Sequence, residues 1–387
     1  MRGFYVRVTT LFQAKRSPVS RACKGLRSLS NVLFEVCFYQ GEKTHPKCNV
    51  RIEPMEDTVF KAMIVEEPQK GTFTRRIGEQ RISDLPPGEV VIRVYYSSLN
   101  YKDALSATGH PGVSRNFPHT PGIDAAGEVV ASSTKTLLPG DRVIVTGYDL
   151  GMNTPGGFGR YIRVPAAWVL KLPPGLSLRE SMILGTAGFT AALSVLRLME
   201  AGVRPGGGDI VVSGATGGVG IIAVALLAKA GYRVVAASGK TREHEFLLAL
   251  GAAEVISREE LLKGSERPLM KERWAGAVDV VGGATLAAIL KATRYGGTVT
   301  CCGLVGSTEL PVNVFPFILR GAGLLGIDSV ECPMGPRVAV WNRLAEEWKL
   351  NSLAELAVEC RLDELEQKIQ TMLHGGLRGR TVVNLTD

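Results

Sequence analysis

The sequence predicts an α/β protein in which a doubly wound parallel sheet of six strands is combined with a smaller β-rich barrel. From Phe60 to about Lys171, before a change of pattern near residue 177, the chain reads as short strands between turns that contain Pro or Gly, which is typical of a small barrel. Beyond that point apolar strands alternate with helices, as a parallel sheet covered on both faces requires. With 387 residues, of which 45% are hydrophobic, the chain is long enough for two domains.

The barrel is expected to form from strands that lie on either side of Pro-Gly and Gly-Gly turns. These strands are Phe60–Val65, Glu89–Ser97, Gly127–Ala131, Asp141–Thr146 and Gly159–Val164. The last residues are expected to return to this barrel through a helix over Asp363–Leu373 and a closing strand over Arg380–Leu385.

The parallel sheet is expected to form from six short strands of nearly continuous apolar character. They are Asp209–Ser213, Arg233–Ala237, Glu254–Ile256, Ala277–Val281, Thr298–Cys302 and Gly323–Ile327. The predicted helices among and after them are Gly218–Gly231, Arg242–Leu250, Thr285–Thr293 and Pro336–Trp348. The resulting domain prediction is an N-terminal extension over 1–58, the barrel over 59–183, the parallel sheet over 184–350 and the return to the barrel over 351–387.

The charge of the chain is concentrated at its start. Residues 1–58 hold ten Lys or Arg and five Asp or Glu, so the rest of the chain has 35 basic and 32 acidic residues. A nearly neutral folded part argues against a nucleic-acid partner. The first 34 residues contain Arg and Ser but no acid, which is the composition of an organellar transit peptide. We therefore expect a mitochondrial or other organellar protein, or a cytoplasmic one if Met55 is the true start.

Neither a membrane span nor a disulfide framework is predicted. The longest apolar stretch, Val211–Ala228, contains Ser213, Thr216 and four Gly, so it cannot be one uninterrupted spanning helix. The seven Cys are few and unevenly spaced, and none lies between Cys48 and Cys301.

A glycine-rich turn predicts a dinucleotide site. Ser213-Gly214-Ala215-Thr216-Gly217-Gly218-Val219-Gly220 follows a strand and opens a helix. Glycines at such a turn let the backbone approach a pyrophosphate, whose charge the free N–H groups and the helix dipole stabilise. The expected contacts are Gly217, Gly218, Val219, Gly220, Ile221 and Ile222.

The end of the next strand predicts which dinucleotide is bound. Sites for NAD place an Asp or Glu there to hold the ribose 2′-hydroxyl. This chain instead has Ser238, Lys240 and Arg242, whose hydroxyl and cations suit a 2′-phosphate. NADPH is therefore the expected cofactor.

Several strings of residues resemble a known family along the whole folded part. They include S-S-L-N-Y-K-D-A-L (97–105), P-G-I-D (121–124), G-T-A-G-F-T-A (185–191), V-V-S-G-A-T-G-G-V-G (211–220) and G-R-T (379–381). The chain resembles the zinc-free, quinone-oxidoreductase-like branch of the medium-chain dehydrogenase/reductase superfamily, and within it the acryloyl-coenzyme A reductases. The resemblance implies a GroES-like barrel, a Rossmann sheet and NADPH-dependent reduction of the C=C bond of acryloyl-CoA to propanoyl-CoA.

Zinc-dependent members of the superfamily use a Cys and a Gly-His-Glu segment for their catalytic metal. Here Tyr101 and Pro-Gly-Ile-Asp (121–124) stand at those places, so no metal site is expected. We expect His110 and His119 to be surface or loop residues, and Cys301 and Cys302 to be core thiols.

The predicted catalytic residues are Tyr101, Asn100 and Asp124. Tyr101 is expected to contact the nicotinamide and to donate a hydrogen bond or proton to the enolate that forms during reduction. Asn100 is expected to be a second donor, with Asp124 holding the arrangement from behind. The resemblance further implies cofactor contacts at Arg242, Glu243, His244, Arg258, Leu304, Ile318 and Ser329, and Arg115 is a candidate for the phosphates of coenzyme A.

Two alternatives remain open from the sequence. On the same scaffold the chain could reduce quinones or other activated alkenes. It could also be a nucleotide-binding protein with a structural or RNA-binding role. A homodimer is expected through edge strands near Gly323–Ile327.

Overall fold

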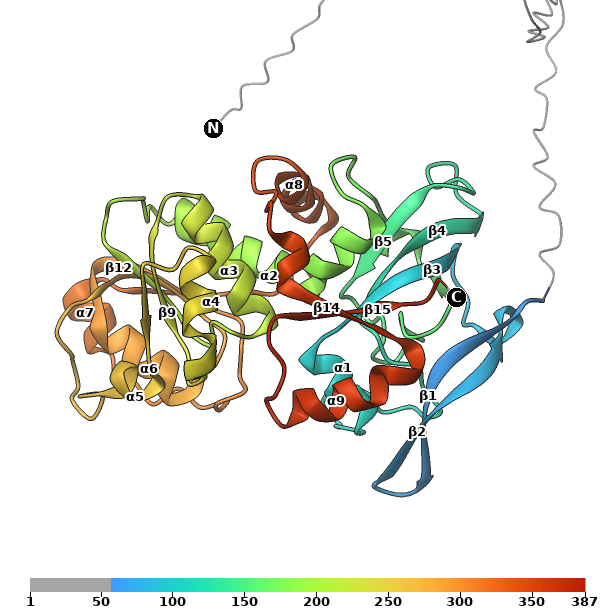
Figure 1. The fold of residues 1–387 in the computed structure, drawn as a ribbon, viewed down its shortest axis with the longest axis horizontal. Coiled ribbons are helices and arrows are strands. Elements are labelled where there is room, and N and C mark those ends of the chain that lie inside the picture. The colour runs from blue at the N-terminus through green and yellow to red at the C-terminus, as the bar shows by residue number, and fades with distance from the viewer. Residues whose placement is uncertain (1–56, 387) are drawn as a thin grey trace, which may run out of the picture. The chain divides into compact units, whose positions relative to one another are not determined.

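The computed structural model describes residues 57–386, which form two sheets and a separate hairpin (Figure 1). The predicted targeting segment in residues 1–58 therefore lies almost entirely outside the described residues. The hairpin pairs β1 (Val59–Gln69) with β2 (Thr72–Arg81) in antiparallel register.

The predicted doubly wound parallel sheet is confirmed, with strand order β10-β9-β8-β11-β12-β13. Its strands are β8 (Asp209–Val212), β9 (Arg233–Ala237), β10 (Glu254–Ile256), β11 (Trp274–Asp279), β12 (Thr293–Cys301) and β13 (Gly323–Gly326). All neighbours run parallel. The order reverses direction at β8, so the loops after β8 and β11 diverge there and leave a crevice for a ligand.

Helices cover both faces of this sheet. Side chains alternate between the two faces along each strand, so apolar strands present apolar side chains on both faces, and both must be covered. Ile210 and Val212 of β8 belong to the hydrophobic cluster of α2 and α3, whereas Val211 between them packs with α5 and α6. The bounds are α2 (Leu178–Glu200), α3 (Gly218–Lys229), α4 (His244–Ala249), α5 (Arg258–Leu262), α6 (Gly283–Ala292), α7 (Phe315–Arg320) and α8 (Met334–Ala345). The predicted helix over Arg242–Leu250 begins with a short 3-10 turn and continues as α4.

The β-rich part is a seven-stranded sheet with strand order β14-β15-β3-β4-β5-β7, in which β6 pairs with β3. The strands are β3 (Val90–Leu99), β4 (Asp124–Ser132), β5 (Arg142–Thr146), β6 (Tyr161–Val164), β7 (Leu170–Lys171), β14 (Ala357–Arg361) and β15 (Arg380–Asn384). The C-terminal strand β15 pairs with β3, so the end of the chain lies in this sheet. Two helices, α1 (Tyr101–Ala107) and α9 (Leu365–Leu373), pack beside this sheet.

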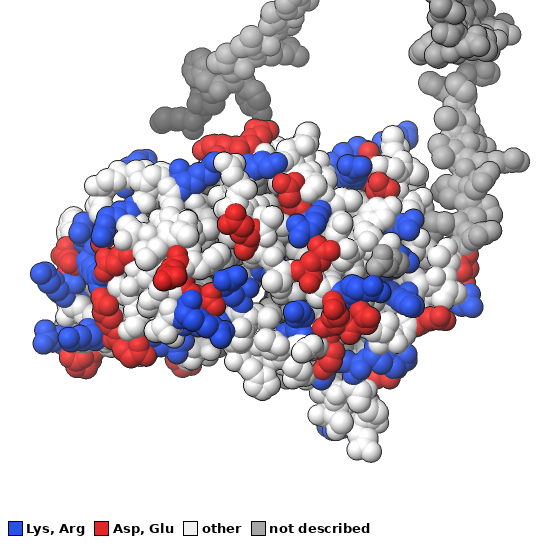
Figure 2. Space-filling model, in the orientation of Figure 1, with Lys and Arg blue, Asp and Glu red and all other residues white. Residues whose placement is uncertain are grey.

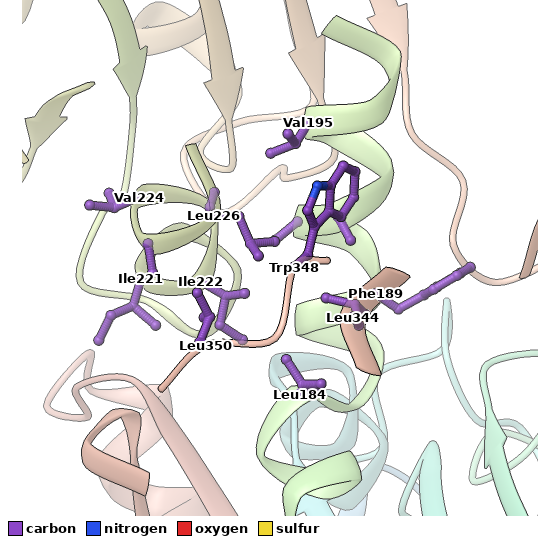
Figure 3. Close-up of a cluster of buried hydrophobic side chains, with 14 of the residues drawn as sticks. Leu184, Phe189, Val195, Ile221, Ile222, Val224, Leu226, Leu344, Trp348 and Leu350 are labelled. Carbon is purple, nitrogen blue, oxygen red and sulfur yellow. The ribbon is translucent and has the colours of Figure 1, made fainter. Parts of the chain in front are cut away.

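The long helix α2 joins the two sheets (Figure 1). Among the described residues it is the one helix long and apolar enough to cross a bilayer, but 78% of its apolar window is buried inside the protein. Its side chains form a core with α3 and with Leu344, Trp348 and Leu350 (Figure 3). At Gly185 the helix is kinked, with φ +52°.

The longest apolar stretch of the sequence is interrupted in the structure. It divides into β8, the glycine-rich turn and α3. On the surface, the face drawn in Figure 2 mixes Lys and Arg with Asp and Glu, in agreement with the nearly balanced charge of the folded part.

Candidate functional site

The glycine-rich turn leaves unpaired donors at the start of α3. Gly217 precedes this helix, and within residues 57–386 nothing accepts a hydrogen bond from the N–H groups of Gly218, Val219 and Gly220. A Cβ at Gly220 would lie 2.3 Å from the Gly214 carbonyl oxygen, so only glycine allows this turn to be so tight. Free N–H groups at the positive end of a helix dipole, in a turn without side chains, fit a pyrophosphate.

A buried carboxylate fixes the turn to the neighbouring strand. Ser213 donates to Asp279 Oδ1 over 2.6 Å, and its Oγ accepts from the Val280 N–H over 2.9 Å. Asp279 Oδ2 accepts from the Gly282 N–H over 2.8 Å. Burial raises the pKa of Asp279. This residue ties β8 to β11 at the point where the crevice opens, and the sequence analysis did not single it out.

The end of β9 brings the predicted Ser238, Lys240, Arg242 and Glu243 together. Ser238 Oγ accepts from the Lys240 N–H over 3.0 Å, and the Lys240 ammonium donates to the Leu377 carbonyl over 2.6 Å. Glu243 Oε1 accepts from Arg242 Nε over 3.2 Å. Burial, and after it the nearby Arg242, lower the pKa of Lys240.

An arginine that the sequence analysis missed completes this cluster. Arg378 donates from Nη1 to Glu243 Oε2 over 3.1 Å, and its guanidinium lies 4.3 Å from the centre of the Phe246 ring. The next residue, Gly379, donates its N–H to the Thr216 carbonyl in the glycine-rich turn over 2.9 Å. The segment before β15 therefore closes over the ends of β8 and β9.

Two further predicted contacts flank the cluster. His244 has a buried Nε2 that finds no hydrogen-bond partner within the described part of the chain. An unpaired polar atom of this kind is expected to meet a ligand or water. Arg258 lies exposed at the start of α5.

On the barrel side, Tyr101 is the first residue of α1 and is 42% exposed. Its hydroxyl has no hydrogen-bond partner among residues 57–386. Asn100 directly precedes the helix and is buried. Its Nδ2 donates to Asp124 Oδ2 over 2.8 Å and also lies 3.2 Å from both the Ser98 carbonyl and Asp103 Oδ2.

Asp124 is fully buried and accepts hydrogen bonds from three elements. Its Oδ2 accepts from Ser98 Oγ over 2.6 Å in addition to the bond from Asn100. Its Oδ1 accepts from Thr186 Oγ1 over 2.6 Å and from the Thr186 N–H over 3.0 Å. The kink at Gly185 in α2 directs these Thr186 donors toward the carboxylate.

Two more charged residues, both missed by the sequence analysis, lie in the same network. Arg380 is buried and donates to Ser98 Oγ over 2.8 Å and to Asn100 Oδ1 over 3.1 Å. Asp103 accepts from the N–H groups of Asn100 over 2.7 Å and Ile123 over 2.8 Å. Burial and the neighbouring Asp124 raise the pKa of Asp103 to about 7. Both missed residues belong to strings that carry the family resemblance.

The two halves of the site meet at Gly218 and Arg380. A Cβ on Gly218 would lie 3.0 Å from Arg380 Nη1, so the turn that fits a pyrophosphate lies next to the network that holds Asn100. The remaining predicted residues are less closely connected. Ser329 is buried with its Oγ 2.7 Å from Thr190 Oγ1, whereas Leu304 and Ile318 are 60% and 72% exposed.

The structure corrects several predictions from the sequence. His119 is a buried residue rather than a surface one, because its segment pairs with β1 and its Nε2 lies 2.9 Å from the Gly151 carbonyl oxygen. Cys301 and Cys302 are partly exposed rather than fully buried thiols: Cys301 ends β12 and packs against a hydrophobic cluster, and Cys302 follows the strand. Their burial is nevertheless enough to raise both thiol pKa values, that of Cys302 to about 12.

Arg115 lies away from the network described above. It lines a cleft of about 560 Å³ together with Glu66 and Glu67. These carboxylates oppose a phosphate, so the cleft gives no support to the candidate contact with coenzyme A. Among residues 57–386, no group of three or more His, Cys, Asp or Glu could hold a metal ion.

Two protein families match the chain. Residues 86–174 match the alcohol dehydrogenase GroES-like domain, and residues 218–344 match the zinc-binding dehydrogenase family. The two matches fall on the seven-stranded sheet and on the parallel sheet with its helices.

Individual relatives match over nearly their whole length. Acrylyl-CoA reductase AcuI of Ruegeria pomeroyi is 42% identical over 328 residues, which cover 84% of this chain and 99% of the relative. The crystal structure of Escherichia coli K-12 YhdH with bound NADPH is 44% identical, with a TM-score of 0.81, and covers 84% of this chain and 100% of that one. The Bacillus subtilis protein yhfP with NAD bound is 45% identical, with a TM-score of 0.82 and coverage of 85% and 100%.

Proposed function

Since the chain belongs to the medium-chain dehydrogenase/reductase superfamily, we propose that it reduces the C=C bond of acryloyl-CoA to propanoyl-CoA with NADPH. The observation that carries this proposal is the closeness of Gly218 to Arg380, whose Nη1 would lie 3.0 Å from a Cβ on the glycine. Through it, a turn suited to a pyrophosphate adjoins the network that holds Asn100, next to the exposed Tyr101. A dinucleotide and a free phenol are thereby brought to the same crevice.

The residues of the chain itself favour NADPH over NADH. The solved relatives contain either NADPH or NAD at nearly equal identity, so the likeness alone does not choose between the two. No carboxylate that would hold a ribose 2′-hydroxyl occurs in the five residues directly after β9 (238–242), and Lys240 and Arg242 stand there instead. In the proposed complex the N–H groups of Gly218, Val219 and Gly220 hold the pyrophosphate, and these two cations pair with the 2′-phosphate.

Bound NADPH supplies a hydride to the β carbon of the thioester. As the C=C bond is reduced, negative charge develops on the thioester oxygen, and a proton is then added to the α carbon. A donor positioned at that oxygen lowers the barrier because it interacts more strongly with the developing charge than with the neutral substrate. Tyr101 is the proposed donor, since its hydroxyl is engaged by no residue in the range 57–386.

Asn100 has a different role in this proposal from the one predicted from sequence. An amide nitrogen has two hydrogens, and three protein oxygens within 3.2 Å already compete for them. Asn100 is therefore a positioning residue, which fixes the start of α1 and with it Tyr101. Asp124 acts one step further back, by holding Asn100.

The proposal extends to the assembly and location of the protein. A homodimer through the edge strand β13 is supported by exposed apolar residues beside it, among them Val314, Phe315 and Leu319. The replacement Leu319→Lys is expected to shift a dimer toward monomer in light scattering, and a monomeric wild-type chain would refute the dimer. Organellar import by residues 1–58 is tested by fusing them to a fluorescent protein, and a diffuse cytoplasmic signal would count against it.

The function is tested by comparing kcat/KM for acryloyl-CoA, crotonoyl-CoA and a benzoquinone, each with NADPH and with NADH. Acryloyl-CoA with NADPH is expected to give the highest value. A preference for the quinone would replace the proposal with the quinone reductase alternative. The double variant Lys240→Ala/Arg242→Ala is expected to raise the KM for NADPH and to leave that for NADH nearly unchanged.

A further inference from the structure

We propose that Arg378 is a specificity-determining residue, which supplies a third cation for the 2′-phosphate and does so from the barrel rather than from the parallel sheet. The inference rests on the proposed use of NADPH. The inference goes beyond that proposal because the sequence motif that distinguishes NADPH from NADH ends at Arg242, more than a hundred residues before Arg378.

The position of Arg378 is fixed by its neighbours on both sides. The Leu377 carbonyl accepts from the Lys240 ammonium over 2.6 Å, and the Gly379 N–H donates to the Thr216 carbonyl over 2.9 Å. The three-residue segment therefore bridges the end of β9 and the glycine-rich turn. Arg378 lies between these two anchors with its side chain 45% exposed, so its guanidinium is held at the rim of the crevice and remains accessible.

Glu243 orients this guanidinium without using all of its donors. The carboxylate accepts from Arg242 at Oε1 over 3.2 Å and from Arg378 at Oε2 over 3.1 Å, and its own side chain is only 9% exposed. A guanidinium has five N–H donors in a fork that matches phosphate oxygens. One bond to Glu243 leaves donors of Arg378 for a ligand, while stacking on Phe246 restricts the plane of the group.

The charges of the cluster match a phosphate monoester. Lys240, Arg242 and Arg378 contribute three positive charges and Glu243 one negative charge, so these four side chains carry a net charge of +2. A phosphate monoester carries about −1.5 to −2 at pH 7. A 2′-hydroxyl in the same place would leave the excess charge without a counterion. Without Arg378 the cluster would carry only +1.

The experiment measures binding of 2′,5′-ADP, NADP⁺ and NAD⁺ to the full chain by calorimetry. Arg378→Ala is expected to weaken 2′,5′-ADP and NADP⁺ by about tenfold, as for a partly exposed charge-assisted contact. Binding of NAD⁺ is expected to stay within twofold, which also shows that the variant is folded. Arg378→Lys, which keeps the charge but loses the fork, is expected to lie between the two. The control Arg267→Ala removes an exposed arginine paired only with the adjacent Glu266 and is expected to change none of the affinities.

A second variant separates ligand binding from a merely structural role. Glu243→Gln raises the net charge of the cluster to +3 and frees donors, so 2′,5′-ADP is expected to bind as well as before or more tightly. If Arg378 only braces Glu243, Glu243→Gln and Arg378→Ala will weaken NADP⁺ and NAD⁺ alike, and the inference is overturned. Equal affinities of the wild-type chain for NADP⁺ and NAD⁺ would instead refute the cofactor part of the proposed function.

Discussion

The replacement Asp124→Asn tests whether the buried network holds the site in place. An amide in place of the carboxylate puts an NH₂ group opposite donors, either those of Thr186 or those of Ser98 and Asn100. Hydrogen bonds to charged groups contribute about 1.5–3 kcal/mol each. The change also removes the countercharge 3.8 Å from the buried Arg380, and breaking a buried pair costs about 3–5 kcal/mol. Because these contributions overlap, we expect a loss of about 4 kcal/mol in the free energy of unfolding.

The loss is measured by urea titration, with kcat and the KM for NADPH determined on the folded variant. Asp141→Asn is the matched control, since Asp141 directly precedes β5 of the same sheet, forms a partly exposed pair with Lys171 over 2.8 Å and is expected to change stability by about 1 kcal/mol or less. A stability loss below about 1 kcal/mol for Asp124→Asn, together with a kcat reduced about 10²-fold, would refute the positioning role and make Asp124 a catalytic residue.

Three further predictions concern single residues. Tyr101→Phe is expected to lower kcat about 10²-fold while leaving the urea midpoint unchanged; a loss below twofold would make Tyr101 a packing residue. Because burial and Asp124 raise the pKa of Asp103 from 3.8 to about 7, the folded chain binds a proton that the unfolded chain releases in this range. The contribution of Asp103 to the free energy of unfolding is therefore expected to fall as pH rises between these values. In urea titrations at several pH values, the wild-type chain is expected to lose stability relative to Asp103→Asn as pH rises; a constant difference between the two would contradict the raised pKa. Gly185→Ala places a Cβ 2.5 Å from Asp124 Oδ2 at φ +52° and is expected to lower the free energy of unfolding by more than about 2 kcal/mol in the same titration. The control Gly202→Ala, at φ +88° with nothing within 4 Å of the new Cβ, is expected to lower it by only about 1 kcal/mol. Equal losses for the two variants would refute the steric argument.

The parallel sheet was predictable because its strands are short, apolar and separated by turn residues. The glycine-rich turn between β8 and α3 marked where the dinucleotide-binding motif begins. The order of the strands follows from the rules for doubly wound parallel sheets. The hairpin strand β2 was not predicted, since it is almost wholly exposed and has no apolar alternation. The helix α2 was not predicted at all, and a glycine in a non-helical conformation lies seven residues into it.

The site was only partly predictable, for a physical reason. Lys240 lies next to a local motif at the end of a strand, and Asn100 and Tyr101 lie in a string that carries the family resemblance, so the sequence pointed to all three. The partners that fix them are distant in sequence: Asn100 is held by Asp124 and Arg380, and the Lys240 ammonium by the Leu377 carbonyl. Such contacts depend on the pairing of β15 with β3, which no local pattern contains.

Gly379, just before β15, explains how Arg378 and Arg380 reach different parts of the protein although they are only two positions apart. In an extended strand, side chains two residues apart point to the same face. Gly379 interrupts that geometry with φ +63°, and a Cβ there would lie 2.3 Å from the Leu356 carbonyl oxygen. Arg378 can therefore reach Glu243 at the end of β9, while Arg380 enters the buried network with Asp124. A single glycine thus allows one short segment to carry both the proposed cofactor contact at Arg378 and the buried Arg380 of the network that holds Asn100.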